Sequence, residues 1–232
     1  MLSFFNRKKK PVIDESALIR DTRFVVVDTE LTGLDEKKDS IVSIGAVRMV
    51  GGTINLGDQF YRLVSPKTEL KAASVRIHEI TPSDVADQPG IEAGLDEFLT
   101  YAGNDVLVGH FISIDRSFLN REMKRIYGCE LPNSVIDTFS VYEWLRKRQR
   151  ARDCFATPFA GYRLYDIIKC FDIPVHGAHN AIMDAFATAQ LFQRFIPYLA
   201  EADAQDLGEL LKVGTPFEGG DQFSISGEFG NF

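Results

Sequence analysis

The sequence predicts an α/β protein whose mixed five-stranded sheet is covered by helices on both faces. Two long strand patterns, Ile41–Val50 and Thr53–Val64, are joined by Gly51-Gly52, a pair that tolerates the positive φ of a tight hairpin. With the strand that precedes them, they form an antiparallel meander. Strand and helix patterns then alternate between residues 69 and 148, which adds parallel strands to the meander.

Each element follows from its apolar pattern. Phe24–Val27, with three β-branched valines, predicts a strand buried on both faces. Gly128 ends a helix. After the meander we expect, in order, helix Glu69–Ile77, helix Ile91–Tyr101, strand Asp105–Gly109, helix Ile114–Tyr127, strand Ser134–Ile136, helix Thr138–Arg148, helix Tyr162–Phe171 and helix Asn180–Leu199.

One folded domain accounts for most of the 232 residues, since a composition of 45% hydrophobic residues supports a large single core. We expect a basic tail and lead-in at residues 1–20, the folded domain at residues 21–212, and a flexible Gly- and Phe-rich tail at residues 213–232. Either tail is a candidate attachment point for a protein partner, although plain disorder is the simpler interpretation of the second.

The composition also bears on the compartment. Cys129, Cys154 and Cys170 have no metal-ligand spacing and suit reduced thiols in a reducing compartment. No apolar run reaches the length of a membrane span, and the short apolar piece at the start precedes a basic run, the reverse of a signal peptide. We therefore expect a cytoplasmic protein with no membrane partner.

The formal net charge of −7 argues against non-specific binding to nucleic acid, which needs positive surface. The segment Arg146–Arg152 is a local exception, with five cations in seven positions. A solvated helix end is the simpler interpretation of this run. It gains a function only if a polyanion site lies nearby.

Asp28 and Glu30 follow the first buried strand at positions i and i+2. Because side chains on a strand alternate faces, both carboxylates point the same way and lie close together. Two like charges this close disfavour each other's ionisation, and a divalent cation between them removes that penalty. Hard cations such as Mg²⁺ and Mn²⁺ prefer carboxylate oxygens. Taken alone, the pair fits a metal site and a polar turn equally well.

Two further acids lie on apolar helix faces. Asp115 is in the first turn of its helix, on the same side as Phe118; alone, it is most simply an acid that favours the helix dipole. Asp184 shares a face with Ala185 and Phe192, where an unpaired charge is costly. Two inward acids together with the strand-borne pair predict convergent metal ligands.

His179 lies five residues before Asp184, at the entrance of the last helix. A lone surface histidine is the commoner interpretation of such a residue. Beside four converging acids, however, a neutral imidazole is placed to accept a proton as a general base.

In this order, the residues resemble the motifs of the DnaQ-like (DEDDh) 3′-5′ exonucleases. Phe24–Leu34 is similar to the first motif, Gly109–Leu119 to the second and His179–Ala185 to the third, and Arg76–Thr81 is similar to a further family segment. The resemblance covers residues 24–198. It implies a ribonuclease H-like fold and a hydrolase that releases nucleoside monophosphates from single-stranded or frayed nucleic-acid 3′ ends.

The resemblance also implies the catalytic residues. His179 would be the general base that activates water. Two divalent ions, Mg²⁺ or Mn²⁺, can stabilise both the attacking and the leaving oxygens of an in-line phosphoryl displacement. They would be held by Asp28, Glu30, Asp115 and Asp184.

Substrate contacts follow from position within the family motifs. The backbone at Leu31 and Thr32 would contact the terminal sugar. Leu34 would wedge beside the terminal base, and His78 would border that base.

The sequence departs from the family pattern at three positions. Phe111 stands where Asn usually follows Gly-His, Ile114 replaces an aromatic residue before Asp115, and Ser43 occupies a place where Glu is frequent. These departures bear on the pocket and on substrate preference rather than on the metal ligands.

Three functions remain open. The first is a DNA-directed 3′-5′ exonuclease for proofreading or repair, of the DNA polymerase III epsilon type. The second is a 3′-5′ exoribonuclease, which differs in how the pocket treats a 2′-hydroxyl. The third is a non-catalytic nucleic-acid-binding or docking module; it ranks last because all four carboxylates and the histidine are present.

Overall fold

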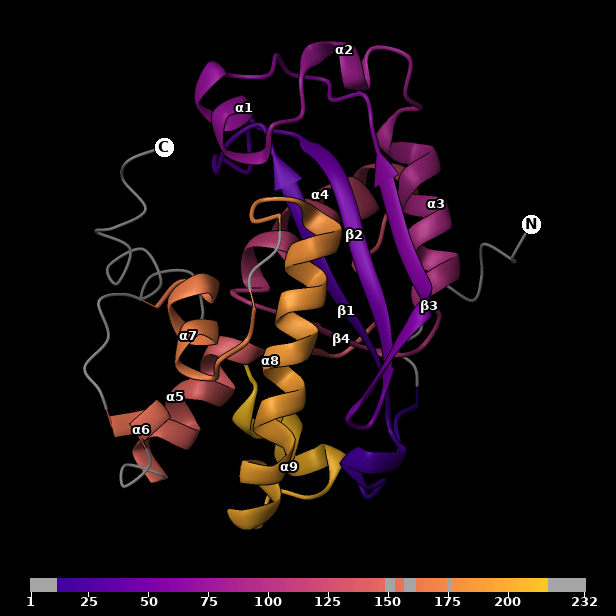
Figure 1. The fold of residues 1–232 in the computed structure, drawn as a ribbon. Helices are drawn as coiled ribbons and strands as arrows, with labels where there is room; N and C mark the ends of the chain where they lie inside the picture. Colours follow the sequence, from indigo (N-terminus) through magenta and orange to yellow (C-terminus); the bar gives the residue numbers. More distant parts are fainter. Residues whose placement is uncertain (1–11, 149–152, 157–161, 175–176, 217–232) are drawn as a thin grey trace.

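The structure is a computed structural model that describes residues 12–148, 153–156, 162–174 and 177–216 (Figure 1). In these residues five strands form one mixed sheet in the order β3-β2-β1-β4-β5. β1 pairs antiparallel with β2 and β2 with β3, whereas β4 lies parallel to β1 and β5 parallel to β4. The strands are β1 (Arg23–Leu31), β2 (Ile41–Val50), β3 (Thr53–Leu63), β4 (Val106–Gly109) and β5 (Val135–Asp137). The predicted meander with parallel additions is confirmed.

Helices cover both faces of the sheet. One face carries α3 (Ile91–Ala102) and α4 (Ser113–Tyr127), and the other carries α5 (Thr138–Arg148), α7 (Leu164–Cys170), α8 (Ala181–Glu201) and α9 (Leu207–Val213). Successive side chains of β1 point to opposite faces of the sheet, so they belong to two different cores. Val25 and Val27 pack beneath α3 and α4, whereas Phe24 and Val26 pack beneath α8.

Two short helices, α1 (Ala72–His78) and α2 (Pro82–Val85), lie near the carboxyl end of β1, at the top of Figure 1. A small apolar cluster of Val42, Ile80 and Val85 holds this segment against β2. The long helix α8, in orange, begins at the same end of the sheet and runs along its face.

Several boundaries differ from the predicted ones. β1 continues past Val27 to Leu31, because its antiparallel pairing with β2 persists through the polar residues. The four-residue helices α2 and α6 (Asp153–Ala156) are too short to show a helical period in the sequence. Helix α9 was also not expected, although the Asp206 carboxylate accepts a hydrogen bond from the Glu209 N–H, a capping signal visible in the sequence.

The predicted lead-in contacts the end of the domain. The Ile19 N–H donates to Gln205 and the Leu207 N–H donates to Ala17. The boundaries placed after residues 20 and 212 stay predictions, and residues 1–11 and 217–232 of the two tails lie outside the described residues. Among the described residues, every helix is too short or too polar to span a membrane.

Candidate metal and active site

The site begins with the end of β1. Asp28 and Glu30 continue the face that packs under α8, with Gly45 and Ser43 as their neighbours on β2. The pairing of β1 with the shorter β4 stops at Val26. The two carboxylates therefore lie on a part of β1 that extends beyond β4, at the start of α8.

Asp184 reaches this position because α8 approaches the sheet closely. A Cβ atom at Gly45 would overlap the backbone of Ala181 and Ile182, so only glycine allows the first turn of α8 to rest on β2. Ala181 and Ala185 are fully buried in the same contact. Small residues on both elements thus bring Asp184 to the strand-borne pair.

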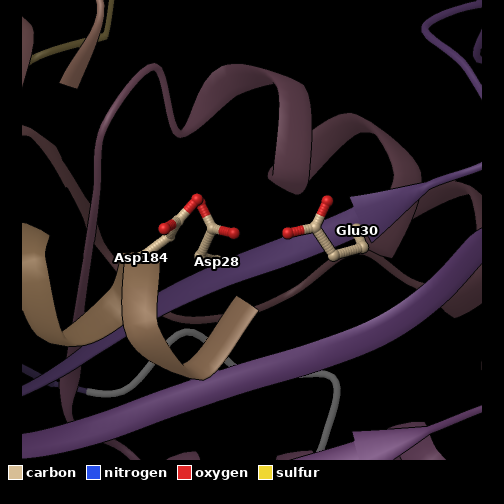
Figure 2. Close-up of side chains that lie close together, drawn as sticks. All are labelled: Asp28, Glu30 and Asp184. Atoms are coloured by element: carbon tan, nitrogen blue, oxygen red, sulfur yellow. The ribbon is translucent and has the colours of Figure 1, made fainter. Parts of the chain in front are cut away.

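Three carboxylates converge at this contact. One oxygen each from Asp28, Glu30 and Asp184 lies within 4.8 Å of the others. Figure 2 shows the side chains of Asp28 and Glu30 on β1 and that of Asp184 on α8, with their carboxylates turned toward one another. The geometry thus brings together three of the four acids that the sequence singles out, and their role as metal ligands stays a prediction.

Asp115 lies beside the group of three rather than within it. Its side chain is 6% exposed, and its Oδ1 accepts hydrogen bonds from the N–H (2.9 Å) and the hydroxyl (2.6 Å) of Thr29. Thr29 points to the α4 face of β1, opposite to Asp28 and Glu30. It therefore anchors Asp115 against the same strand that carries the other two acids.

Mutual repulsion and burial dominate the electrostatics. Burial, followed by the charges of Asp115, Asp184 and Glu30, raises the pKa of Asp28 well above its ordinary value. Burial and the charges of Asp184 and Asp115 raise the pKa of Glu30 to about 8, and burial raises that of Asp115 to about 7. A divalent cation relieves such repulsion. The ligand type, spacing and charge of these residues therefore fit a bound divalent cation.

His179 stands at the entrance of α8 with an exposed side chain and a left-handed backbone of φ 61°. Burial raises the pKa of Asp184, while a hydrogen bond from Tyr165 and the charge of His179 oppose that rise. The histidine therefore lies near the carboxylates, as its predicted role requires.

A cavity of about 750 Å³ opens between β3, the α1–α2 segment and the start of α8; residues that flank Asp184 line it, whereas the four acids themselves do not. Its lining includes Tyr61, His78, His179 and Met183. The His78 Nδ1 accepts the Ile80 N–H (3.0 Å), which places the proton of the neutral ring on Nε2. This nitrogen is buried and has no hydrogen-bond partner among the described residues.

The other residues predicted to contact the substrate differ in how exposed they are. Leu34 is 37% exposed and accessible, whereas Leu31 is half-buried. Thr32 is fully buried, its N–H donates to the Ser40 carbonyl (2.9 Å), and its hydroxyl bonds Asp39 (3.2 Å). The Thr32 N–H is thus committed within the loop, and any sugar contact there falls to carbonyl oxygens.

The family profile described as Exonuclease matches residues 25–192. The chain belongs to this exonuclease family. The match confirms the resemblance drawn from the motifs, the exonuclease class and the predicted fold. The family depends on divalent metal ions, and the acidic cluster of this exonuclease offers ligands for them.

Curated relatives agree with the assignment. The exonuclease is 32% identical over 179 residues to "DNA polymerase III subunit epsilon" of Aquifex aeolicus, covering 77% of this chain and 83% of the relative. It is 34% identical over 193 residues to "DNA polymerase III PolC-type" of Oceanobacillus iheyensis, covering 83% of this chain. The matched region spans only 13% of that PolC-type relative and 14% of the one from Thermotoga maritima.

Solved structures show the same fold. "Exonuclease X in complex with 5' overhanging duplex DNA" superposes with a TM-score of 0.60 at 25% identity, covering 82% of this chain and 99% of the other. E. coli Exonuclease I with a dT13 oligonucleotide has a TM-score of 0.66 at 17% identity, covering 79% of this chain and 43% of the other. The second likeness concerns the fold alone.

The departures of this exonuclease from the family pattern have structural explanations. Phe111 has a left-handed backbone of φ 54°, a conformation that Asn adopts more easily, and its N–H donates to the buried carboxylate of Asp137 (3.0 Å). Ile114 packs partly buried against both apolar cores. Ser43 lies opposite Glu30 and beside the Tyr61 hydroxyl.

The second-motif histidine serves the fold rather than the chemistry. His110 Nε2 lies 3.0 Å from the Tyr162 carbonyl oxygen, and Nδ1 lies 2.9 Å from the Thr138 hydroxyl. Burial lowers the pKa of His110 to about 4, so the ring is neutral at pH 7. It ties β4 and the start of α5 to the loop before α7.

The basic run gains no role from its surroundings. Arg146 makes a bidentate ion pair with Glu143 (2.7 and 2.9 Å), and the Arg148 guanidinium stacks 3.7 Å from the Trp144 ring. Both lie at the carboxyl end of α5, away from the start of α8 in Figure 1. These contacts favour a solvated helix end, and residues 149–152 lie outside the described residues.

Sequence reasoning missed four residues that shape the site: Thr29, Gly45, Asp137 and Tyr165. Strand alternation could have shown that Thr29 faces the helix of Asp115. A glycine inside a buried strand signals a close backbone approach and could have identified Gly45. Tyr165 left no signal, because its contact with Asp184 joins two helices whose relative placement the sequence does not state.

Proposed function

We propose that this chain is a divalent-metal-dependent 3′-5′ exonuclease that removes nucleoside monophosphates from single-stranded or frayed DNA ends. The observation that carries the proposal is the convergence of Asp28, Glu30 and Asp184 within 4.8 Å, with Asp115 alongside, in a member of the exonuclease family. No arrangement of this kind is needed for a docking module, because buried like charges weaken the fold unless they serve a ligand.

Asp28, Glu30 and Asp184 would hold Mg²⁺ or Mn²⁺, and Asp115 would complete the set for a second ion. When bound, the ions would supply positive charge that stabilises both the attacking and the leaving oxygen in the displacement at phosphorus. The chain itself supplies the geometry. Thr29 holds one oxygen of Asp115, and Gly45 sets the height of Asp184 above the sheet.

His179 would act as the general base. Its exposed imidazole at the rim of the cavity accepts a proton from the attacking water at a ring nitrogen. The neighbouring carboxylate of Asp184 stabilises the imidazolium that results. This role requires a ring that is neutral before the reaction.

The cavity would receive the terminal nucleotide. His78 lines the cavity and would border the base, and the accessible side chain of Leu34 can pack beside the base. DNA is the proposed substrate because the similar chains are named as DNA polymerase III subunits and the solved relative at 25% identity is bound to DNA. A protein partner bound through either tail and a cytoplasmic location stay predictions.

The test is digestion of matched 5′-labelled DNA and RNA oligonucleotides, single- and double-stranded, with Mg²⁺, Mn²⁺ or EDTA. Stepwise shortening of DNA from the 3′ end, lost in EDTA, is expected. Asp184→Asn is the control for contaminating nucleases and should be inactive. Faster shortening of RNA would replace the proposed substrate, and no digestion of either strand would remove the proposed activity.

A further inference from the structure

Tyr165 contacts both halves of the third motif from a different helix. It lies in the first turn of α7, and its hydroxyl donates a hydrogen bond to Oδ1 of Asp184. Its ring also lies beside the His179 ring, with centroids 5.7 Å apart and an interplanar angle of 58°. One side chain therefore contacts a proposed metal ligand and the proposed base.

The backbone conformation of His179 is unfavourable unless neighbouring groups hold it in place. Its φ of 61° lies in the left-handed region, which residues with a Cβ adopt only where the surrounding structure holds them. The His179 N–H acts electrostatically on both the Asp184 carboxylate and the Tyr165 hydroxyl and lowers the pKa of each. Tyr165 and Asp184 thus both lie beside the entrance of α8.

Asp184 is constrained by the same contact. Its backbone N–H donates to Asn180 (2.8 Å), which fixes the first turn of α8 but not the side chain. The bond from Tyr165 restricts rotation of the carboxylate, whose neighbours include the like-charged Asp28 and Glu30.

The helix that carries Tyr165 is itself firmly anchored. Ile167 and Ile168 of α7 are fully buried in the core that includes α8. Tyr165 is partly buried at the edge of this core, so its hydroxyl is presented from a fixed support. Figure 1 shows α7 next to α8, on the same face of the sheet.

We infer that Tyr165 is a positioning residue that sets the orientation of the Asp184 carboxylate and of His179. The inference rests on the proposed exonuclease function and adds a residue that none of the motifs contains. Residues that hydrogen-bond a metal ligand commonly change metal affinity or activity by about 10–100-fold when they are removed. The hydroxyl, rather than the ring, carries this role.

Tyr165→Phe tests it, because the substitution keeps the ring and removes the hydroxyl. In the metal-free protein, the dissociation constant for Mn²⁺, measured by calorimetry, should rise by roughly tenfold. The kcat for a single-stranded DNA oligonucleotide should fall by a similar factor while KM stays unchanged.

Tyr101→Phe is the matched control. The Tyr101 hydroxyl donates to the Asp58 carbonyl oxygen (2.7 Å) on β3, so this variant also loses one hydroxyl hydrogen bond. Its Mn²⁺ affinity and kcat should equal those of the unaltered chain. If Tyr165→Phe lowers only the melting temperature, as a merely structural hydroxyl would, the positioning role is wrong.

A double variant separates the two contacts. If Tyr165 acts partly through His179, the loss of kcat caused by Tyr165→Phe should be smaller in a His179→Ala background. Equal losses in both backgrounds would restrict the role to Asp184. The proposed exonuclease function is tested separately by Asp184→Asn, and it is wrong if this variant stays active. If Asp184→Asn is inactive and Tyr165→Phe is fully active, only the positioning role of Tyr165 is wrong.

Discussion

Gly45 lies directly beneath Ala181, and no side chain fits between them. This contact joins β2 to the first turn of α8 and sets how far Asp184 stands from Asp28. The spacing of the carboxylates therefore depends on a residue with no functional group.

Gly45→Ala should lower both stability and activity. The added methyl group must push α8 away from the sheet, at a cost of about 1–3 kcal/mol for an overpacked contact. Asp184 moves with the helix, so DNA shortening should slow by about tenfold or more below the melting temperature. Gly57→Ala on β3 is the matched control, since a Cβ there would meet only the Asn55 side chain at 3.7 Å. Full activity of Gly45→Ala would show that this contact does not set the site.

Asp28→Asn should separate stability from function. The substitution keeps the shape of the side chain and removes a charge that burial and three acidic neighbours disfavour. In EDTA at pH 8 the variant should be more stable than the unaltered chain, because the uncompensated charge is removed. Mn²⁺ binding and activity should be lost. Asp87→Asn, at an exposed position, should change neither property; an active or destabilised Asp28→Asn would contradict the assignment.

His179→Gln should impair chemistry and leave binding intact. Removal of a general base typically slows a reaction by about 10²–10⁴-fold. The dissociation constants for Mn²⁺ and for a DNA oligonucleotide, measured by calorimetry and fluorescence anisotropy, should stay within about twofold of the original. A parallel loss of binding would make His179 a structural residue.

His110 should make the fold sensitive to acid. Burial lowers its pKa to about 4, below the ordinary value of 6.5, so the unfolded chain binds a proton that the folded chain does not. Its contribution is complete above pH 6.5 and is lost as the pH falls toward 4, by up to about 3 kcal/mol. The acids of raised pKa act in the opposite direction over this range, so the loss is measured as the difference in urea unfolding between the unaltered chain and a His110→Asn variant at pH 7 and pH 4. This variant should lose less stability over the same range, and an unchanged slope would assign the effect to other groups.

The convergence of the acids was predictable because each signal is local. Alternation along a strand places Asp28 and Glu30 on one face, and helical spacing places Asp115 and Asp184 on inward faces. Their nearness then follows from the topology, since β1 ends where α4 and α8 begin. The strand itself proved longer than its apolar run, because pairing with β2 continues through Asp28 and Glu30.

The contacts that refine the site could not be predicted in this way. Two hydrogen bonds join segments whose separation depends on how whole helices pack. One links Thr29 to Asp115, and the other links Tyr165 to Asp184. The sugar contact expected of the backbone at Leu31 and Thr32 stays a prediction; the sequence did not show that the Ser40 carbonyl accepts the Thr32 N–H. Sequence patterns report the face on which a residue lies, whereas such bonds depend on distances between faces.

The acids of the site come from opposite ends of the domain, two from its first strand and one from its last long helix. During synthesis on the ribosome, the amino-terminal pair therefore emerges well before its partner on α8. Under the proposed mechanism, cleavage of nucleic acid requires that this helix has left the exit tunnel and docked. The order of the sequence would thus withhold the proposed activity from incomplete chains.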